Sequence, residues 1–339
     1  MKPINRSAGI LPAPNPLFPG TLFPGTFFSR LTLNMLLGLV LSLSTACQAD
    51  RATHSTATPT PDCGEEGKFI EIPAGEFVRG SDRAERDYGY KISGQAAADS
   101  PAEIPEKTAA LRRRRWFERE PERETVALPG FCLGRNLVTN TDYQDFIQAT
   151  GHRVPGISAE DYQEQGFLVH PYAEVEPYLW QEDQYPEGEG QHPVVLVSQE
   201  DAIAYATWKG QQDGYTYRLP TAQEWEKAAR GTTGQYFPWG NDWQDDATNW
   251  AQEGDYHTSA IATYPLSRSE YGVEDLAGNV FEWTSTPARR LDGPAVLLKG
   301  CSWDDLPGFC RAAYQHSRPV GSRHILFGFR LVREPDTLK

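Results

Sequence analysis

The sequence of 339 residues lacks the motifs that identify several large classes of enzyme. It contains no P-loop, no GxSxG nucleophile motif and no GxGxxG before a predicted helix. No internal repeat or heptad pattern is visible, so repeat arrays and coiled coils are not indicated. Acidic residues outnumber basic ones, and the formal net charge of −14 argues against nucleic acid as a partner, because an acidic surface repels phosphate.

Clusters of histidine or of basic residues are also scarce. No two histidines form an HxH or HxxxH pair, so the spacing signals no iron or zinc cluster, and each is expected to be a surface or hydrogen-bonded residue. The one basic run, residues 112–115, is followed by alternating acids and bases and is predicted to be solvated and paired within its own segment. The histidines are His54, His152, His170, His192, His257, His316 and His324.

The composition that remains is typical of a globular protein. Hydrophobic residues make up 39% and charged residues 23%, and the length allows one large domain or two ordinary ones. Glycine (30), proline (26) and tryptophan (9) are frequent. This mixture predicts many turns and loops held by large aromatic side chains.

Residues 1–47 are predicted to be a signal peptide. An apolar stretch begins at Met35 and is too short to span a bilayer of roughly 30 Å. It ends in small residues followed by Cys47, which resembles a bacterial lipobox. We therefore predict a protein exported to the cell envelope and anchored to a membrane by a lipid on Cys47. The alternative is an ordinary secretory signal with an incidental cysteine.

Residues 48–67 are polar, rich in Ser, Thr and Pro, and are predicted to form a flexible linker. Export implies an oxidising compartment, where cysteines pair. Four cysteines remain after Cys47, and they permit three complete disulfide connectivities among which the sequence does not choose. They are Cys63, Cys132, Cys301 and Cys310.

Residues 68–335 are predicted to form the folded domain, with an α+β pattern. Residues 69–80 alternate around a Pro-Ala-Gly turn and predict a hairpin, and residues 124–139 alternate again. Between them, residues 81–123 form a charged insertion for which no structure is predicted. Residues 156–191 are loop-like.

Helical patterns mark three places in this domain. One helix is predicted to begin near Asn140 or Thr141 and to stop at Gly151. An apolar strand is predicted to reach Val197, followed by a helix that begins at Ser198. The clearest helix begins at Thr221, has Glu224 in a capping box and ends at Gly231.

Separated stretches of the sequence, taken in order, resemble one family. They include IPAGEFVRGS at 72–81, LVTNTDYQDFIQATGH at 137–152, RLPTAQEWEKAARG at 218–231, DLAGNVFEWT at 275–284 and GFRLVRE at 328–334. Together they resemble the formylglycine-generating enzyme / sulfatase-modifying-factor domain over residues 68–335. The resemblance implies a C-type-lectin-like α+β fold with short strands, two main helices and much irregular chain. The fold alone does not fix the activity.

The resemblance also implies Ca²⁺. In DLAGNVFE, the carboxylates of Asp275 and Glu282 and the carbonyls of Gly278 and Val280 match a calcium motif of the family, and oxygen donors at this spacing suit a hard cation. A second family site corresponds to three residues, with an alignment gap between them: Asn249, Trp250 (through its carbonyl) and Asp255. Solvated acidic loops are the alternative.

Oxidase chemistry is supported less well. The resemblance implies oxidation of a substrate cysteine to formylglycine by O₂ and a copper ion held by two cysteines. Here Asp305 stands where the first copper cysteine is expected, and Cys310 matches the second. Copper is therefore predicted only if Cys301 and Cys310 can pair around it, and a structural disulfide or two buried thiols are the alternative. Ser302 matches a family active-site serine, which makes Cys310, Cys301 and Ser302 the candidate catalytic set.

Three functions stay open at this point. The incomplete copper pair favours a binding or accessory protein that acts on an exported protein or peptide, or on a glycan, and whether the chain is an enzyme is left undecided. The alternative is a formylglycine-generating oxidase. A third is a ligand-binding protein diversified by a retroelement, because residues 304–327 contain no Lys, Glu, Met or Trp. Four tryptophans line a binding groove or fill the core: Trp180, Trp243, Trp250 and Trp303.

Overall fold

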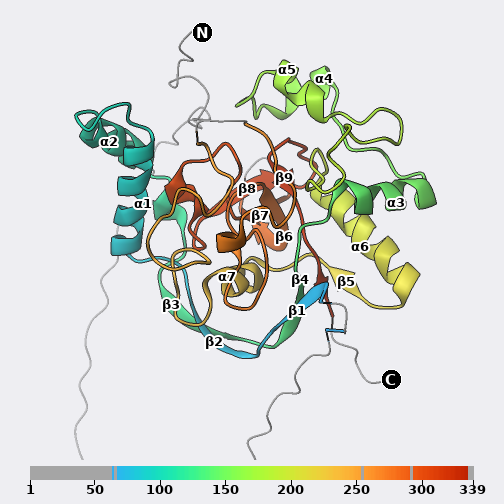
Figure 1. Cartoon of the computed structure of the whole chain (residues 1–339), viewed down its shortest axis with the longest axis horizontal. Helices are drawn as coiled ribbons and strands as arrows, with labels where there is room; N and C mark the ends of the chain where they lie inside the picture. Colours follow the sequence, from blue (N-terminus) through green and yellow to red (C-terminus); the bar gives the residue numbers. More distant parts are fainter. Residues whose placement is uncertain (1–62, 65–66, 253–255, 291–292, 335–339) are drawn as a thin grey trace, which may run out of the picture. The chain divides into compact units, whose positions relative to one another are not determined.

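The computed structural model describes residues 63–64, 67–252, 256–290 and 293–334. Helices and short strands alternate with much irregular chain, so the predicted α+β class is confirmed (Figure 1). None of the described helices has the length and apolar character needed to cross a membrane. The predicted signal peptide, Cys47 and most of the predicted linker lie outside the described residues.

Two antiparallel pairings join the start of the domain to residues 124–134. Strand β2 (Gly75–Arg79) pairs with β3 (Glu124–Leu128). Strand β1 (Phe69–Ile72) pairs with β4 (Phe131–Gly134), and that sheet is completed by β10 (Val332–Arg333) and β5 (Tyr217–Arg218). The predicted hairpin over 69–80 is therefore wrong. β1 and β2 are neighbours in sequence, but each pairs with residues at least 45 positions away.

The third sheet supports the functional region. Its strand order is β8-β7-β6-β9, with β6 (Phe281–Ala288) in the middle beside β7 (Ala295–Lys299). β8 (Gln315–Pro319) pairs with β7, and the two-residue β9 (Phe327–Gly328) runs parallel to β6. This sheet joins the end of the predicted calcium motif to the segment that carries the cysteines.

Three helices begin and end close to where the sequence predicts. α3 (Asn140–Thr150) is capped by Thr139 and ends at Gly151. α6 (Gln199–Asp213) and α7 (Ala222–Arg230) are capped by Ser198 and Thr221, each with a capping box. Local side-chain chemistry at the first turn explains why these helices could be predicted. The strand predicted up to Val197 is absent from the described structure, which has only an isolated bridge between Thr139 and Pro193 there.

The charged insertion is helical. It contains α1 (Arg83–Ala96) and α2 (Ile104–Arg114), followed by the single turn η1 (Phe117–Arg119), and the two helices lie against each other (Figure 1). Asp82 caps α1, and Arg112 of the basic run pairs with Asp87 of α1. The basic run thus lies at the C-terminal end of α2, and Arg112 pairs within the insertion.

The predicted loop over 156–191 contains short helices. They are α4 (Ala159–Gln165), α5 (Tyr172–Val175) and the turn η2 (Glu176–Tyr178). Two further turns, η3 (Pro265–Ser267) and η4 (Pro307–Cys310), lie in the C-terminal half. The cysteines form two disulfides, Cys63–Cys132 and Cys301–Cys310, so one of the three permitted connectivities is selected.

Candidate functional site

The turn after β7 brings the candidate catalytic residues together. Gly300 has a φ of +77°, and a Cβ there would stand 3.2 Å from the ring of Trp225. The chain then continues through Cys301 and Ser302 to η4, where Cys310 is bonded to Cys301. Both cysteines are fully buried. In this state neither sulfur is a thiolate, so neither can bind Cu(I).

Asp305 holds the turn that contains Ser302. The Ser302 hydroxyl donates a hydrogen bond to the Asp305 carboxylate, and the Ser302 backbone N–H donates to the same carboxylate oxygen at 2.9 Å. Burial raises the pKa of Asp305 to about 7, although both hydrogen bonds from Ser302 lower it. The residue that replaces the expected copper cysteine therefore fixes the position of the candidate serine.

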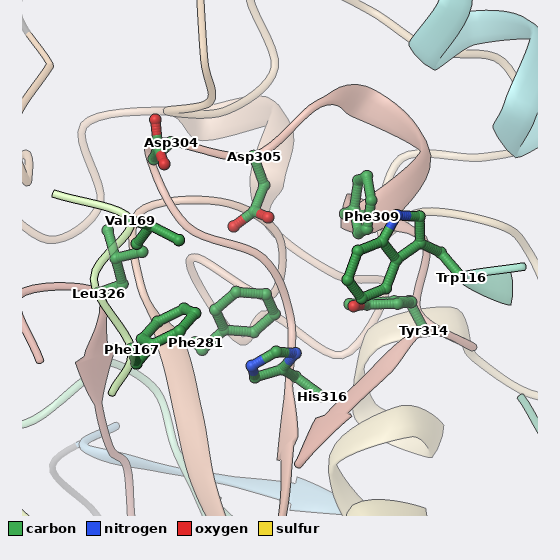
Figure 2. Close-up of a pocket in the computed structure, with 10 residues that line it drawn as sticks. All are labelled: Trp116, Phe167, Val169, Phe281, Asp304, Asp305, Phe309, Tyr314, His316 and Leu326. Atoms are coloured by element: carbon green, nitrogen blue, oxygen red, sulfur yellow. The ribbon is translucent and has the colours of Figure 1, made fainter. Parts of the chain in front are cut away.

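A small cavity lies beside this turn. Its volume is about 40 Å³, and Figure 2 shows Asp304 and Asp305 on one side, with aromatic rings and the aliphatic side chains of Val169 and Leu326 around the rest. The insertion contributes Trp116, and the chain of the α4–α5 region contributes Phe167. Ligand pockets for whole small molecules are roughly 300–1,000 Å³, so this cavity is suited to the end of one side chain.

His170 connects the cavity to a pair of carboxylates. Its Nε2 is 3.2 Å from Asp304, and its Nδ1 is 2.7 Å from Glu174. Burial disfavours the charged imidazole, but the Asp304 and Glu174 carboxylates outweigh it and raise the pKa of His170. Trp303 lies against His170, with 5.1 Å between ring centroids.

A buried cation, Arg318, lies against Phe167, one of the rings that line the cavity. The guanidinium of Arg318 lies 3.4 Å from the ring centroid of Phe167, and burial lowers its pKa to about 9. Burial and the nearby Arg318 charge also hold the pKa of His316 well below its usual value. Its imidazole is therefore neutral at pH 7.

The predicted calcium loop is buried and strongly curved. Asp275, Gly278 and Asn279 all have φ between +54° and +74°. The Asp275 carboxylate accepts hydrogen bonds from the Ala262 N–H at 2.8 Å and from the Ser267 hydroxyl at 3.4 Å. Burial raises the pKa of Asp275, so a cation at this carboxylate would stabilise its charged form. The Gly278 N–H donates to the sulfur of Cys301, which ties this loop to the disulfide.

Glu282, at the end of the loop, already has a cationic partner. Arg330 donates two hydrogen bonds to its carboxylate, at 2.6 and 2.8 Å, and both residues are buried. A carboxylate oxygen has a second lone pair, so the oxygen donors in this loop still fit Ca²⁺ in chemistry. The first calcium site of Asp275, Gly278, Val280 and Glu282 stays a prediction.

Two residues of the second predicted calcium site, Asn249 and Trp250, take part in hydrogen bonds within the chain. Asn249 donates through its side chain to the carbonyl of His257 at 2.8 Å, and its own carbonyl accepts from Asn279. The carbonyl of Trp250 accepts from Gln252. Asp255 lies outside the described residues. This second site also stays a prediction.

The four tryptophans proposed for a groove are packed into the domain. Trp180, Trp250 and Trp303 are less than a tenth exposed, and Trp243 is partly buried against the same apolar core. The cavity is instead lined by residues that no motif singles out, such as Trp116, Phe167 and His316. They come from segments far apart in the sequence, so local patterns gave no signal for them.

Comparison with known proteins adds three findings. The family model described as "Sulfatase-modifying factor enzyme 1-like domain" matches residues 55–335. "Inactive C-alpha-formylglycine-generating enzyme 2" of Bos taurus is 33% identical over 217 residues, covering 55% of this chain and 69% of the relative. "Formylglycine-generating enzyme" of Mycobacterium tuberculosis is 29% identical over 293 residues, covering 65% and 93%.

A solved structure, PvdO from Pseudomonas aeruginosa, has a similar fold. The TM-score is 0.55 at 20% identity, over 78% of this chain and 94% of that one. At this identity the likeness concerns the fold alone.

Proposed function

Because this chain belongs to the family of the sulfatase-modifying factor enzyme 1-like domain, we propose its role within that family. It acts as a binding or accessory protein of the cell envelope, and its partner is an exported protein or peptide. O₂-dependent oxidation of a cysteine to formylglycine is the alternative. Family membership is neutral between the two, since one relative is named as an enzyme and another as inactive.

The disulfide between Cys301 and Cys310 is the observation that carries this proposal. Copper in an oxidase of this type needs two thiolates, and here the two nearest sulfurs are bonded to each other and buried. Asp305, the residue at the expected first copper position, is a carboxylic acid bound to Ser302. A carboxylate does not replace a thiolate as a ligand of Cu(I), a soft ion.

The cavity supports a peptide partner. Its volume of about 40 Å³ and its mainly apolar lining suit the tip of one apolar side chain. Asp304 and Asp305 line the cavity, and the guanidinium of Arg318 lies against Phe167, which also lines it. A peptide that inserts one small side chain here would be positioned by these charged groups. This mainly apolar lining suits an apolar side chain better than a hydroxylated sugar ring, so a peptide is the favoured partner.

A direct assay separates the two functions. The chain is reduced, loaded with Cu(I) and incubated with a peptide that carries a sulfatase motif, and mass spectrometry follows the peptide's cysteine. We expect no conversion, while an active family enzyme converts the same peptide as a positive control. Loss of mass at the cysteine, abolished in a Cys310→Ser variant, would establish the oxidase instead.

A further inference from the structure

Three side chains from two loops meet at a place that no motif in the sequence marks. Glu189 and His192 lie on the segment before α6, and His257 lies on the segment after Asn249. One imidazole nitrogen from each histidine and one carboxylate oxygen of Glu189 all lie within 4.8 Å of one another. Among the described residues this is the one group of three or more such side chains with that geometry.

A tight turn places Glu189 and His192 together. The His192 N–H donates to the Glu189 carbonyl at 3.0 Å. Asn140, at the first position of α3, then holds both residues: its backbone N–H donates to the His192 carbonyl at 2.9 Å and its side chain donates to the Glu189 carbonyl at 2.9 Å. The pair is therefore fixed to the start of a helix rather than carried by an unsupported loop.

His257 approaches from the other loop and is also held in place. Its Nε2 is 3.2 Å from a carboxylate oxygen of Glu189. Its ring is stacked on Tyr178, with 4.3 Å between centroids and 7° between planes. Its backbone carbonyl accepts the side-chain hydrogen bond of Asn249 at 2.8 Å. Both the plane and the backbone of His257 are thus fixed.

Thr258 orients both imidazoles. The Nδ1 of His192 is 2.9 Å from the Thr258 hydroxyl oxygen, and the Nδ1 of His257 is 3.2 Å from the Thr258 carbonyl and 3.2 Å from its hydroxyl. With each Nδ1 engaged in this way, Nε2 is the ring nitrogen available to a metal ion, and the Nε2 of His257 already points at the Glu189 carboxylate. Metal-binding histidines are oriented in the same manner, by a hydrogen bond at the nitrogen opposite the metal.

We propose that Glu189, His192 and His257 bind one divalent transition-metal ion of the Zn²⁺ type. Two imidazole nitrogens and one carboxylate oxygen form a ligand set that suits Zn²⁺, whereas Ca²⁺ takes oxygen ligands only. The side chains of His257 and Glu189 are 29% and 19% exposed, so solvent reaches the cluster and a water molecule completes the coordination.

The test is titration of the full chain, freed of metal, with Zn²⁺ alone, followed by calorimetry. We expect one Zn²⁺ to bind per chain. Glu189→Gln or His192→Ala should lower the Zn²⁺ affinity by roughly 100-fold or more, because mutation of residues that only orient metal ligands already lowers affinity by about 10–100-fold. Thr258→Val should weaken it by about tenfold. His152→Asn is the matched control. The His152 side chain is 27% exposed and pairs with Asp201, but His152 is not part of the Glu189, His192 and His257 cluster, so this variant should not change the Zn²⁺ affinity.

A second measurement does not depend on how the variants fold. Zn²⁺ should protect His192 and His257 of the unmodified chain from carbethoxylation, mapped by mass spectrometry, while His152 stays reactive. An excess of Ca²⁺ should not displace this protection. Unchanged Zn²⁺ affinity in folded Glu189→Gln protein, or equal modification of His192 and His257 with and without Zn²⁺, would overturn the proposal.

Discussion

At the scale of single residues, Asp305 shows how burial sets the charge of a candidate-site group. Its pKa rises from the ordinary value of 3.8 to about 7 because its carboxylate leaves water, and the neighbouring Asp304 raises it further. Hydrogen bonds from Ser302 and the charge of His170 act in the opposite direction without cancelling the effect. The turn that holds Ser302 therefore depends on a carboxyl group that titrates near neutral pH.

This raised pKa predicts a pH dependence of stability. Below pH 3.8 the carboxyl is protonated in both folded and unfolded chains, so its contribution is fully present. Between pH 3.8 and about 7 the unfolded chain releases the proton first, and stability falls as pH rises, by on the order of 1–4 kcal/mol. Asp305→Asn should remove this decline, measured as the free energy of unfolding in urea across that range. Asp183→Asn should keep the wild-type slope, because the pKa of Asp183 is lowered rather than raised. Identical slopes in all three proteins would contradict the assignment.

The predicted calcium site makes a second prediction at this scale. A chelator should lower the melting temperature of the wild-type chain if Ca²⁺ stabilises the charge of Asp275. Asp275→Asn should reduce that sensitivity, because the amide keeps an oxygen donor but removes the negative charge. This variant is cleaner than a change at Glu282, whose removal would leave the guanidinium of Arg330 buried without its carboxylate and would destabilise the fold by about 3–5 kcal/mol on its own. The same melting temperature with and without chelator would count against the site.

At the scale of elements, local signals predicted the helices and long-range pairing decided the strands. Thr221 with Glu224, and Ser198 with Asp201, place hydrogen-bonding side chains at fixed short spacings, and the helices begin there. Alternation over 69–80 could predict that strands exist but not which partners they take. The helices within residues 81–123 were not predicted, for a different reason. α1 and α2 are polar helices, and Arg112 of α2 pairs with Asp87 of α1. A charge-rich sequence of this kind looks the same whether it is helical or solvated irregular chain.

Contact between α1 and α2 depends on a small residue. A Cβ on Gly94 would stand 1.9 Å from the Thr108 hydroxyl oxygen, which is shorter than atoms can approach, and 3.0 Å from the Thr108 Cα, which is a tight contact. Gly94 is helical and buried, so no backbone conformation requires glycine there. The reason for glycine at this position is the close packing of the two helices.

Gly94→Ala is therefore expected to push α2 away from α1 and to destabilise the fold by about 1–3 kcal/mol, even though alanine is the better helix former. Urea unfolding measures this loss. Gly321→Ala serves as the control, because nothing lies within 4 Å of its added Cβ, and should change stability by less than about 0.5 kcal/mol. A stabilised Gly94→Ala variant would show that the helix pair is not tightly packed.

At the scale of the whole molecule, the candidate site is assembled from segments that only the fold brings together. Family motifs led from the sequence to Cys301, Ser302 and Cys310, because these lie close to each other in one turn. The walls of the cavity and the cluster around His257 could not be predicted, since their members come from separate loops. Histidine spacing in the sequence is informative only when the ligands share one element.

The two disulfides favour the prediction that the protein is exported. A bond that closes a loop of 69 residues, between Cys63 and Cys132, stabilises a fold by about 4 kcal/mol in the chain-entropy account, and such bonds persist in oxidising compartments. With four cysteines paired, Cys47 is the one left for another role. Its place after an apolar stretch and three small residues makes lipid attachment the expected one.

The full chain, produced in a bacterium that processes lipoproteins, is therefore expected to partition into the detergent phase. Its mature N-terminus should be Cys47 carrying a lipid, read by mass spectrometry of the N-terminal peptide. Cys47→Ser should abolish both lipid and detergent partitioning. Cys63→Ser is the matched control, because it removes a cysteine of the disulfide and should leave the lipid in place. Cleavage at another residue, giving a mature chain without lipid, would favour the ordinary secretory signal, because a cleaved chain that carries no acyl group has nothing to hold it in the membrane.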